Sequence, residues 1–161
     1  MAVDMFLEIE GEIKGESKDK KHADAIDILA WSWGLSNSGT FHQGGGGGAG
    51  KANFQDISVT KYIDSSSHAL MLYCANGDHF DKAKIYVRKA GKTPLEYVVI
   101  TMTKVMVTSY STGGSGGEDL LTENISLNFE EVKVEYKKQK PDGTGEAAKT
   151  FDWNIGANDG K

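Results

Sequence analysis

A run of glycines that ends in a lysine is the part of the sequence most suggestive of chemistry. Residues 45–51 follow the pattern G-x-x-x-x-G-K, in which the backbone N–H groups of a phosphate-binding loop hold a nucleotide. Such a loop also needs Ser or Thr next, to hold Mg²⁺, and a helix after it, whereas Ala52 follows here and leads toward an alternating segment at Ile57 and Val59. A glycine run meets this pattern by accident, so the sequence favours a flexible loop or arm. A nucleotide-binding enzyme that uses this loop stays as an alternative.

The other side chains with catalytic or metal-binding potential are scattered along the chain. They are the histidines His22, His42, His68 and His79, the single cysteine Cys74, and the acidic pair Glu118 and Asp119. The histidines have no metal-ligand spacing, and a nucleophilic cysteine needs an adjacent base that the sequence does not signal. We therefore expect no catalytic residue, no metal site and no cofactor, and we predict that the chain is not an enzyme.

Composition is typical of a soluble globular protein of one domain, residues 1–161, because 39% of the residues are hydrophobic and 25% are charged. A net charge of -5 gives little reason to expect binding to nucleic acid. No run approaches the roughly 18 apolar residues of a membrane-spanning helix, and the first ten residues lack the features of a signal peptide. We expect synthesis in the cytoplasm, no membrane insertion, and any export by a route without a cleaved signal.

Between two glycine clusters the hydrophobic pattern has a period of two, which is typical of strands. The alternating segments lie around residues 5–10, 57–60, 82–88 and 125–136. The phase of the last segment slips at Glu130–Glu131, as a β-bulge would produce. Residues 97–107 are apolar or Thr almost throughout, which predicts a central strand buried on both faces. Short gaps between these segments favour antiparallel connections, so we predict a mostly β fold, an antiparallel barrel or sandwich.

One segment departs from the β pattern. Asp64 or Ser65 is a suitable N-cap, apolar residues from Ala69 to Cys74 recur at spacings of three and four, and Asn76–Gly77 gives a stop signal. These signals predict a single short helix of about three turns, lying on the side of the sheet.

The segment 26–35 reads as a strand with two different faces. One face carries large apolar side chains that we expect in the core: Leu29, Trp31, Trp33 and Leu35. The other face becomes small and polar toward its end: Ile26, Ile28, Ala30, Ser32 and Gly34. The small face would suit either close packing against a neighbouring element or a surface turned toward a subunit or a shared cavity, and spacing does not choose between them.

Long stretches of the chain closely resemble the haemolysin-coregulated protein family. The stretches are GESKDKKHADAIDILAWSWG at 15–34, GGGGGAGKANFQDISVTKYIDSSS at 44–67, KIYVRKAG at 84–91 and STGGSGGEDLLTENISLNF at 111–129, with Trp153-Asn154-Ile155 near the end. The parts least like the family are Ala69–Phe80 and the tail from Lys137 onward. The resemblance implies a compact β-barrel of two sheets with one flanking helix.

The resemblance also implies a function. Family members form hexameric rings that stack into the inner tube of a type VI secretion system, and the tube protein is itself secreted. Implied partners are further copies of the chain, a trimeric spike protein, a contractile sheath, and small effector proteins in the ring lumen. Ala30 and Ser32 are expected to face that lumen. The glycine-rich stretch at about 41–53 is expected to be an arm between subunits or rings, with Gly44, Gly45, Gly46, Gly47, Gly48, Gly50 and Lys51. A stand-alone β-barrel binding module stays as a second alternative.

Overall fold

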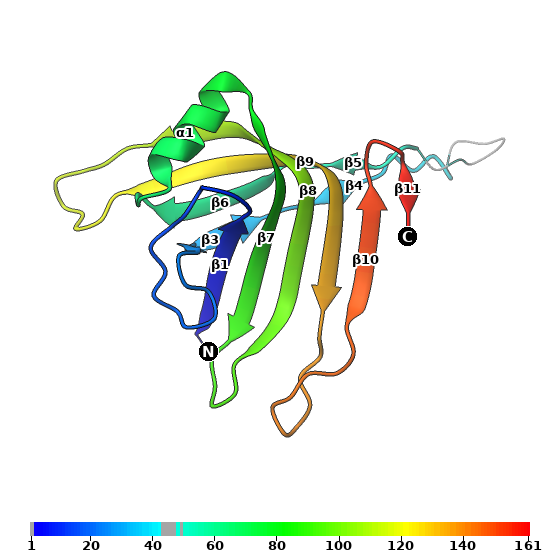
Figure 1. Ribbon diagram of the computed structural model, residues 1–161. Coiled ribbons are helices and arrows are strands. Elements are labelled where there is room, and N and C mark those ends of the chain that lie inside the picture. The colour runs from blue at the N-terminus through cyan, green and yellow to red at the C-terminus, as the bar shows by residue number, and fades with distance from the viewer. Residues whose placement is uncertain (1, 43–47, 49) are drawn as a thin grey trace.

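The computed structural model describes residues 2–42, 48 and 50–161, which form eleven strands and one helix (Figure 1). The strands are β1 (Val3–Ile9), β2 (Ile26–Asp27), β3 (Ala30–Ser32), β4 (Leu35–Ser36), β5 (Asn53–Phe54), β6 (Ile57–Tyr62), β7 (His79–Lys89), β8 (Leu95–Thr112), β9 (Thr122–Tyr136), β10 (Lys149–Asn154) and β11 (Asp159–Gly160). The helix is α1 (Ser67–Asn76). The prediction of a mostly β fold with one short helix is confirmed.

All strand pairs are antiparallel, and nine strands belong to one sheet. Its order is β11-β10-β9-β8-β7-β1-β2, while β6 pairs with the first part of β9 and β3 pairs with β6. β4 and β5 form a separate small hairpin. The turn at 90–94 joins β7 to β8 and the loop at 113–121 joins β8 to β9, both too short for a crossover helix, as predicted. The predicted central strand, β8, lies between β7 and β9. The predicted burial of both its faces is wrong, because Thr101 and Thr103 are only partly buried and Lys104 is exposed.

The sheet turns a corner along β7, β8 and β9. In Figure 1 their lower parts run side by side with β1 and β10, whereas the upper parts of β8 and β9 turn aside and run alongside β6. At this corner the buried phase changes in β9 between Phe129 and Val132, as predicted. The predicted bulge is wrong, however, because the pairing of β9 with β8 keeps one register across the change. At the same corner, Lys104 of β8 forms an ion pair with Glu130 of β9 and has a φ of 52°. This left-handed conformation turns β8 without adding a residue to it.

The core lies inside this bent sheet and is closed on one side by α1. Leu7, Ile57, Leu70, Ile85 and Leu127 are among the fully buried side chains. Leu70 belongs to α1, so burial of one face of this helix supplies the stability that a ten-residue helix lacks by itself.

The helix follows its sequence signals closely at one end. It ends at Gly77, whose φ of 70° gives the left-handed C-cap that glycine allows, and the Gly77 N–H donates to the Tyr73 carbonyl. Its N-cap is Ser66, one residue after the predicted Ser65. The Asp64 carboxylate instead accepts from the backbone N–H of Ser66 at 2.8 Å. No helix in the described ranges is long and apolar enough to cross a membrane.

The segment 26–35 differs from the predicted continuous strand. It is broken into β2, β3 and the start of β4, because the chain changes partner within it: the Ile28 N–H donates to β1, and the Leu29 N–H donates to β6. The change of partner also reverses part of the predicted burial. Ile28 is buried, whereas Leu29 and Leu35 are 41% and 50% exposed.

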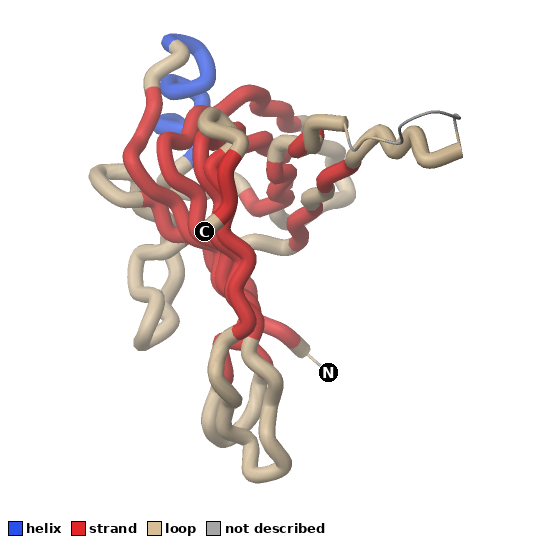
Figure 2. Tube along the Cα trace, turned by 90° about the vertical axis from the view of Figure 1, so that its right-hand side faces the viewer, coloured by secondary structure: helices blue, strands red, loops and turns tan. Residues whose placement is uncertain are grey.

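Loops extend the molecule in three directions. The β4–β5 hairpin continues away from the body on one side, and the β8–β9 loop, residues 113–121, projects on the other (Figure 1). Figure 2, turned by 90°, shows further loops at the lower end of the long strands. Among them is the turn at 90–94, between β7 and β8.

Candidate functional site

Ala30 and Ser32 lie on β3, at an exposed face of the sheet. In register, Ala30 is opposite Thr60 of β6, and Ser32 is opposite Ser58. Directly opposite residues in a sheet share one face, so the side chains of Ala30 and Ser32 lie beside Thr60 and Ser58. Both residues are exposed in the protomer, so the small face of this segment is not packed against a neighbouring element of the same chain; that it faces a lumen stays a prediction.

The same face continues across two more strands. Ser58 and Thr60 are paired with Ser126 and Asn124 of β9, and these are paired with Ser109 and Ser111 of β8. The Thr60 hydroxyl donates to the Asn124 side-chain oxygen at 2.6 Å. We call this the neutral face; its residues are Ala30, Ser32, Ser58, Thr60, Ser109, Ser111, Asn124 and Ser126. None of them is charged in a chain with 25% charged residues. Such a face offers hydroxyl and amide groups and no charged side chain of its own.

The four strands beneath the neutral face have two edges that the protomer leaves open. In the described part of the chain, β8 pairs with β7 only as far as Met106. The residues of β8 after Met106 therefore pair with β9 alone. β3 pairs only with β6. An open edge presents unpaired backbone N–H and C=O groups, which are a template for pairing with another chain. The sheet is thus built for extension at both sides.

The glycine-rich arm is described only in part. Gly44, Gly45, Gly46 and Gly47 lie outside the described residues, whereas Gly48, Gly50 and Lys51 lie within them. The side chains of Asn37 and Thr40 donate to the carbonyls of Gly50 and Gly48, at 2.6 and 3.0 Å, and so connect the two sides of the hairpin. The segment is flanked by two-residue strands β4 and β5, and the chain continues into β6. A phosphate-binding loop needs a helix at that place, so the nucleotide-binding alternative is wrong.

The scattered histidines and the cysteine stay apart. His42, His68 and His79 are exposed, and Cys74 is a partly buried free thiol on α1. Among the described residues, no three His, Cys, Asp or Glu side chains are grouped as metal ligands.

Of the four histidines only His22 is buried, and its contacts hold a loop in place. Its ring is stacked on Phe6, Nδ1 is 2.7 Å from Glu8 Oε1, and Nε2 contacts Glu96. Burial lowers the pKa of His22, but the hydrogen bonds to the two carboxylates outweigh this effect and raise the pKa above 6.5. A neighbouring ion pair joins Arg88 to Asp19, and this bond holds the Asp19 pKa well below its usual range. These contacts fasten the loop between β1 and β2 to the sheet.

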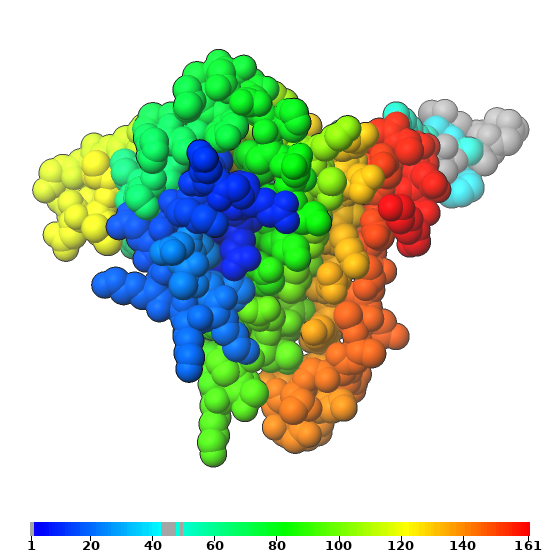
Figure 3. Space-filling view, viewed as in Figure 1, coloured from blue at the N-terminus to red at the C-terminus, as the bar shows by residue number. Residues whose placement is uncertain are grey.

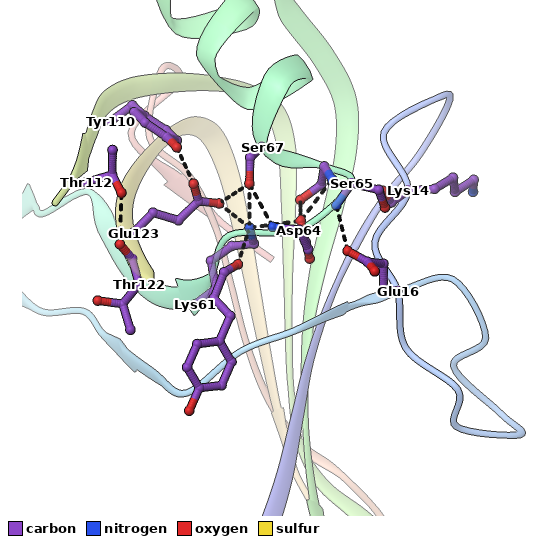
Figure 4. Close-up of polar contacts among 12 residues, drawn as sticks. Lys14, Glu16, Lys61, Asp64, Ser65, Ser67, Tyr110, Thr112, Thr122 and Glu123 are labelled. Atoms are coloured by element: carbon purple, nitrogen blue, oxygen red, sulfur yellow. Dashed lines mark hydrogen bonds and ion pairs between the residues drawn. The ribbon is translucent and has the colours of Figure 1, made fainter. Parts of the chain in front are cut away.

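A second buried polar cluster, which we did not predict, lies under α1 (Figure 4). The side chains of Lys61 and Glu123 are fully buried and form an ion pair between β6 and β9. Ser67, at the start of α1, donates to Glu123 at 2.8 Å, and Tyr110 of β8 also donates to Glu123. Burial, reinforced by Glu123, raises the pKa of Tyr110 to about 12, so its hydroxyl stays protonated as a donor.

A signal for this cluster was present in the sequence. Lys61 continues the buried phase of Ile57 and Val59, and Glu123 has the same phase as Ile125 and Leu127. Two opposite charges at core positions of neighbouring strands predict a buried pair. Figure 4 shows how Lys61, Glu123 and Ser67 connect the sheet to the first turn of the helix. Because all three are inside the protein, the cluster is a structural support and not a site for a substrate.

Known proteins match almost the whole chain. Residues 6–136 match the model of the family described as "Type VI secretion system effector, Hcp". The chain is 58% identical over 160 residues to Protein hcp1 of Pseudomonas aeruginosa PAO1, with 98% of each chain covered. Among solved structures, a type six secretion system protein has a TM-score of 0.93 at 29% identity, covering 99% of this chain and 100% of its own. Hcp1 from Salmonella typhimurium has a TM-score of 0.82 at 37% identity, with both chains covered completely.

These matches agree with the fold. The family match spans most of the chain, and the identity to a relative of equal length is far above what shared architecture alone requires. The chain therefore belongs to the Hcp family of type VI secretion systems, a family of secreted structural proteins of the tube and not of enzymes.

Proposed function

We propose that this chain, as one domain with a glycine-rich arm, closes into a hexameric ring and that its rings stack into the inner tube. The observation that carries the proposal is the four-stranded part of the sheet, β3-β6-β9-β8, with a neutral outer face and an open edge at each side. Pairing of the β8 edge of one copy with the β3 edge of the next uses two different surfaces. Such a head-to-tail contact forms a ring when the rotation closes.

In this ring the neutral face lines the lumen. Ala30 and Ser32 then contact small effector proteins that the ring carries and protects. The arm that contains Gly48, Gly50 and Lys51 reaches a neighbouring subunit or ring, since its hairpin projects away from the body (Figure 2). The tube is capped by a trimeric spike and surrounded by a contractile sheath. The protein is made in the cytoplasm and leaves through the apparatus, without removal of a signal peptide.

Native mass spectrometry and light scattering test the ring directly. We expect a species near the mass of six protomers, and a chain that is monomeric from micromolar to millimolar concentration would refute the proposal in favour of a stand-alone binding module.

Replacement of Ser32 tests the lumen. Ser32→Gln adds a bulky neutral group to the neutral face, so we expect the ring to persist and the recovery of a cognate effector with it to fall at least several-fold. A matched control is Thr103→Gln, which is on β8 outside the neutral face and only partly exposed. Equal effector recovery with Ser32→Gln and with the unaltered protein would remove Ser32 from the lumen.

A further inference from the structure

The charges of this protein are divided between two ends of the molecule. We define the basic end as residues 18–21, 88–96 and 137–149, which lie at the lower end of the long strands (Figure 3). Ten of the 18 Lys and Arg residues belong to it: Lys18, Lys20, Lys21, Arg88, Lys89, Lys92, Lys137, Lys138, Lys140 and Lys149. Only four of the 23 acidic residues do: Asp19, Glu96, Asp142 and Glu146. The chain with a net charge of -5 therefore has a strongly positive end and a negative remainder.

Three segments far apart in the sequence are joined at the basic end. Asp19 pairs with Arg88, which brings the first segment to the end of β7. The Lys137 N–H donates to the Tyr97 carbonyl at 2.8 Å, and Leu95 lies beside Gly145, so the other two segments are neighbours. In Figure 3 the turn at 90–94 and the loop at 137–148 are seen side by side at the bottom of the molecule.

Most cations of the basic end have no acidic partner in the protomer. Within the described residues, the ion pairs of the chain involve Arg88 but none of the lysines of this end. Lys92, Lys138 and Lys140 are exposed. By contrast, the lysines Lys61, Lys104 and Lys133, which lie outside this end, each form an ion pair. Lysines crowded together in this way repel one another, and an acidic surface placed against them would remove that repulsion.

The opposite end of the same strands carries unpaired acids. Glu10 and Glu12 follow the end of β1, Asp78 precedes β7, and Asp81 is near its start. All four are exposed, and none forms an ion pair with a described residue of the protomer. The pocket beside Glu10 is lined by the three lysines Lys14, Lys82 and Lys84, so the four acids still outnumber them and the balance is negative. We call these four residues the acidic end.

We propose that the basic end of one copy contacts the acidic end of the next copy and thereby selects the partner for ring closure. This inference rests on the proposed ring. A second copy is favoured as the occupant because one chain carries both complementary surfaces, at opposite ends of β1 and β7. Head-to-tail assembly requires this arrangement, since every contact joins one end to the other.

The two open sheet edges are arranged in the same direction as the two charged ends: the β8 edge lies toward the acidic end and the β3 edge toward the basic end. The last part of β8 lies against α1, whose C-terminal end is followed by Asp78 of the acidic end. β3 is at the opposite side of these four strands from β8, and in Figure 1 it lies on the side away from α1, toward the lower end of the molecule. Pairing of the β8 edge with the β3 edge of the next copy therefore brings an acidic end and a basic end to the same contact. Charge complementarity guides such an encounter and penalises the reversed orientation.

Charge reversal with reconstitution tests the inference. One variant has Lys20→Glu, Lys21→Glu, Lys92→Glu, Lys138→Glu and Lys140→Glu, which leaves five cations against nine acids at the basic end, so that both of its ends are acidic. The second has Glu10→Lys, Glu12→Lys and Asp81→Lys, so that both of its ends are basic. At 0.15 M salt, where charges interact over about 8 Å, we expect the mass of each variant alone to fall from the hexamer to the protomer. In an equal mixture the two variants alternate, every contact again joins opposite charges, and we expect the hexamer to return.

Several results would decide against the inference. Native mass spectrometry of the mixture must show rings that contain both variants in equal number. A misfolded variant could not enter such a ring, so this result also shows that both variants fold. If each variant alone forms the hexamer at the same concentration as the unaltered chain, the two ends do not meet. If both variants show the circular dichroism of the unaltered chain yet their mixture stays dissociated, charge does not select the neighbour. An unaltered chain that never forms a ring would instead refute the proposed function.

Discussion

Removal of the buried cation Lys61 should weaken the protein severely. Its Nζ donates to Glu123, to Asp64 at 3.0 Å and to the Tyr62 carbonyl at 2.9 Å, and no part of the side chain is exposed. Lys61→Met keeps most of the side-chain volume but leaves the Glu123 carboxylate buried without its counter-ion. Loss of one partner of a buried ion pair costs about 3–5 kcal/mol. For a domain of this size we expect the unfolding midpoint to fall by roughly 10 °C.

A double-mutant cycle separates the ion pair from ordinary packing. The free energy of unfolding is measured by urea denaturation at neutral pH for Lys61→Met, for Glu123→Leu and for the double variant. The double variant has no buried charge, so we expect it to be more stable than Lys61→Met by about 1–3 kcal/mol. It should stay below the unaltered protein, because the hydroxyls of Ser67 and Tyr110 lose an acceptor in the core.

The protomer concentration must be fixed in these measurements, because assembly itself raises apparent stability. A cost below about 1 kcal/mol for Lys61→Met would show that the pair is solvated or dispensable, against the cited range for buried pairs. Strictly additive effects in the double variant would show that Lys61 and Glu123 act independently. Either result would refute the role that the burial of these two side chains implies.

Two further predictions concern the loop between β1 and β2. Because the folded state raises the His22 pKa above 6.5, the charged form stabilises the protein fully below that pH, and the contribution is lost as pH rises through the folded pKa. His22→Gln should remove the decrease of the unfolding free energy with pH above pH 6.5. If urea denaturation at several pH values shows the same decrease in the variant as in the unaltered protein, His22 is not its source. A Cβ on Gly15 would lie 2.5 Å from the Ala25 carbonyl oxygen, so Gly15→Ala should cost about 1–3 kcal/mol. A Cβ on Gly91 would meet open space, so the free energy of unfolding of Gly91→Ala should lie within about 0.5 kcal/mol of that of the unaltered protein in urea denaturation. Equal losses for Gly15→Ala and Gly91→Ala would contradict the packing argument.

Hydrophobic periodicity carried most of the information on the fold. It located β1, β6, β7 and β9, because one face of each strand is buried and the other is exposed to solvent over much of its length. Caps located the helix, since Gly77 can adopt a left-handed conformation that ends it. The resemblance to a family led from this fold to a secretion tube, which no periodicity indicates. Spacing did not decide whether the small face with Ser32 is packed or exposed; the structure shows Ser32 exposed in the protomer, and its role in the lumen stays a prediction.

Periodicity failed where burial depends on which strands become neighbours. Leu29 and Leu35 read as core residues, but the chain passes from β1 to β6 between Ile28 and Leu29, and both leucines remain largely exposed. The sheet corner was visible as a phase slip at Glu130, and only the pairing showed that Lys104 turns the strand without a bulge. A strand carries its own alternation, but its partners fix where each face points.

The sequence by itself determined that this chain is a mostly antiparallel β protein of the Hcp family with one helix and no predicted active site. Only the tertiary structure decided three further properties: that Lys61 and Glu123 meet in the core, that eight small residues from four strands form one neutral face, and that the charges separate into a basic and an acidic end. The physical reason is that each property joins residues from different strands or loops of the sequence. Such residues become neighbours only when the strands that carry them pair, and no local pattern contains that pairing.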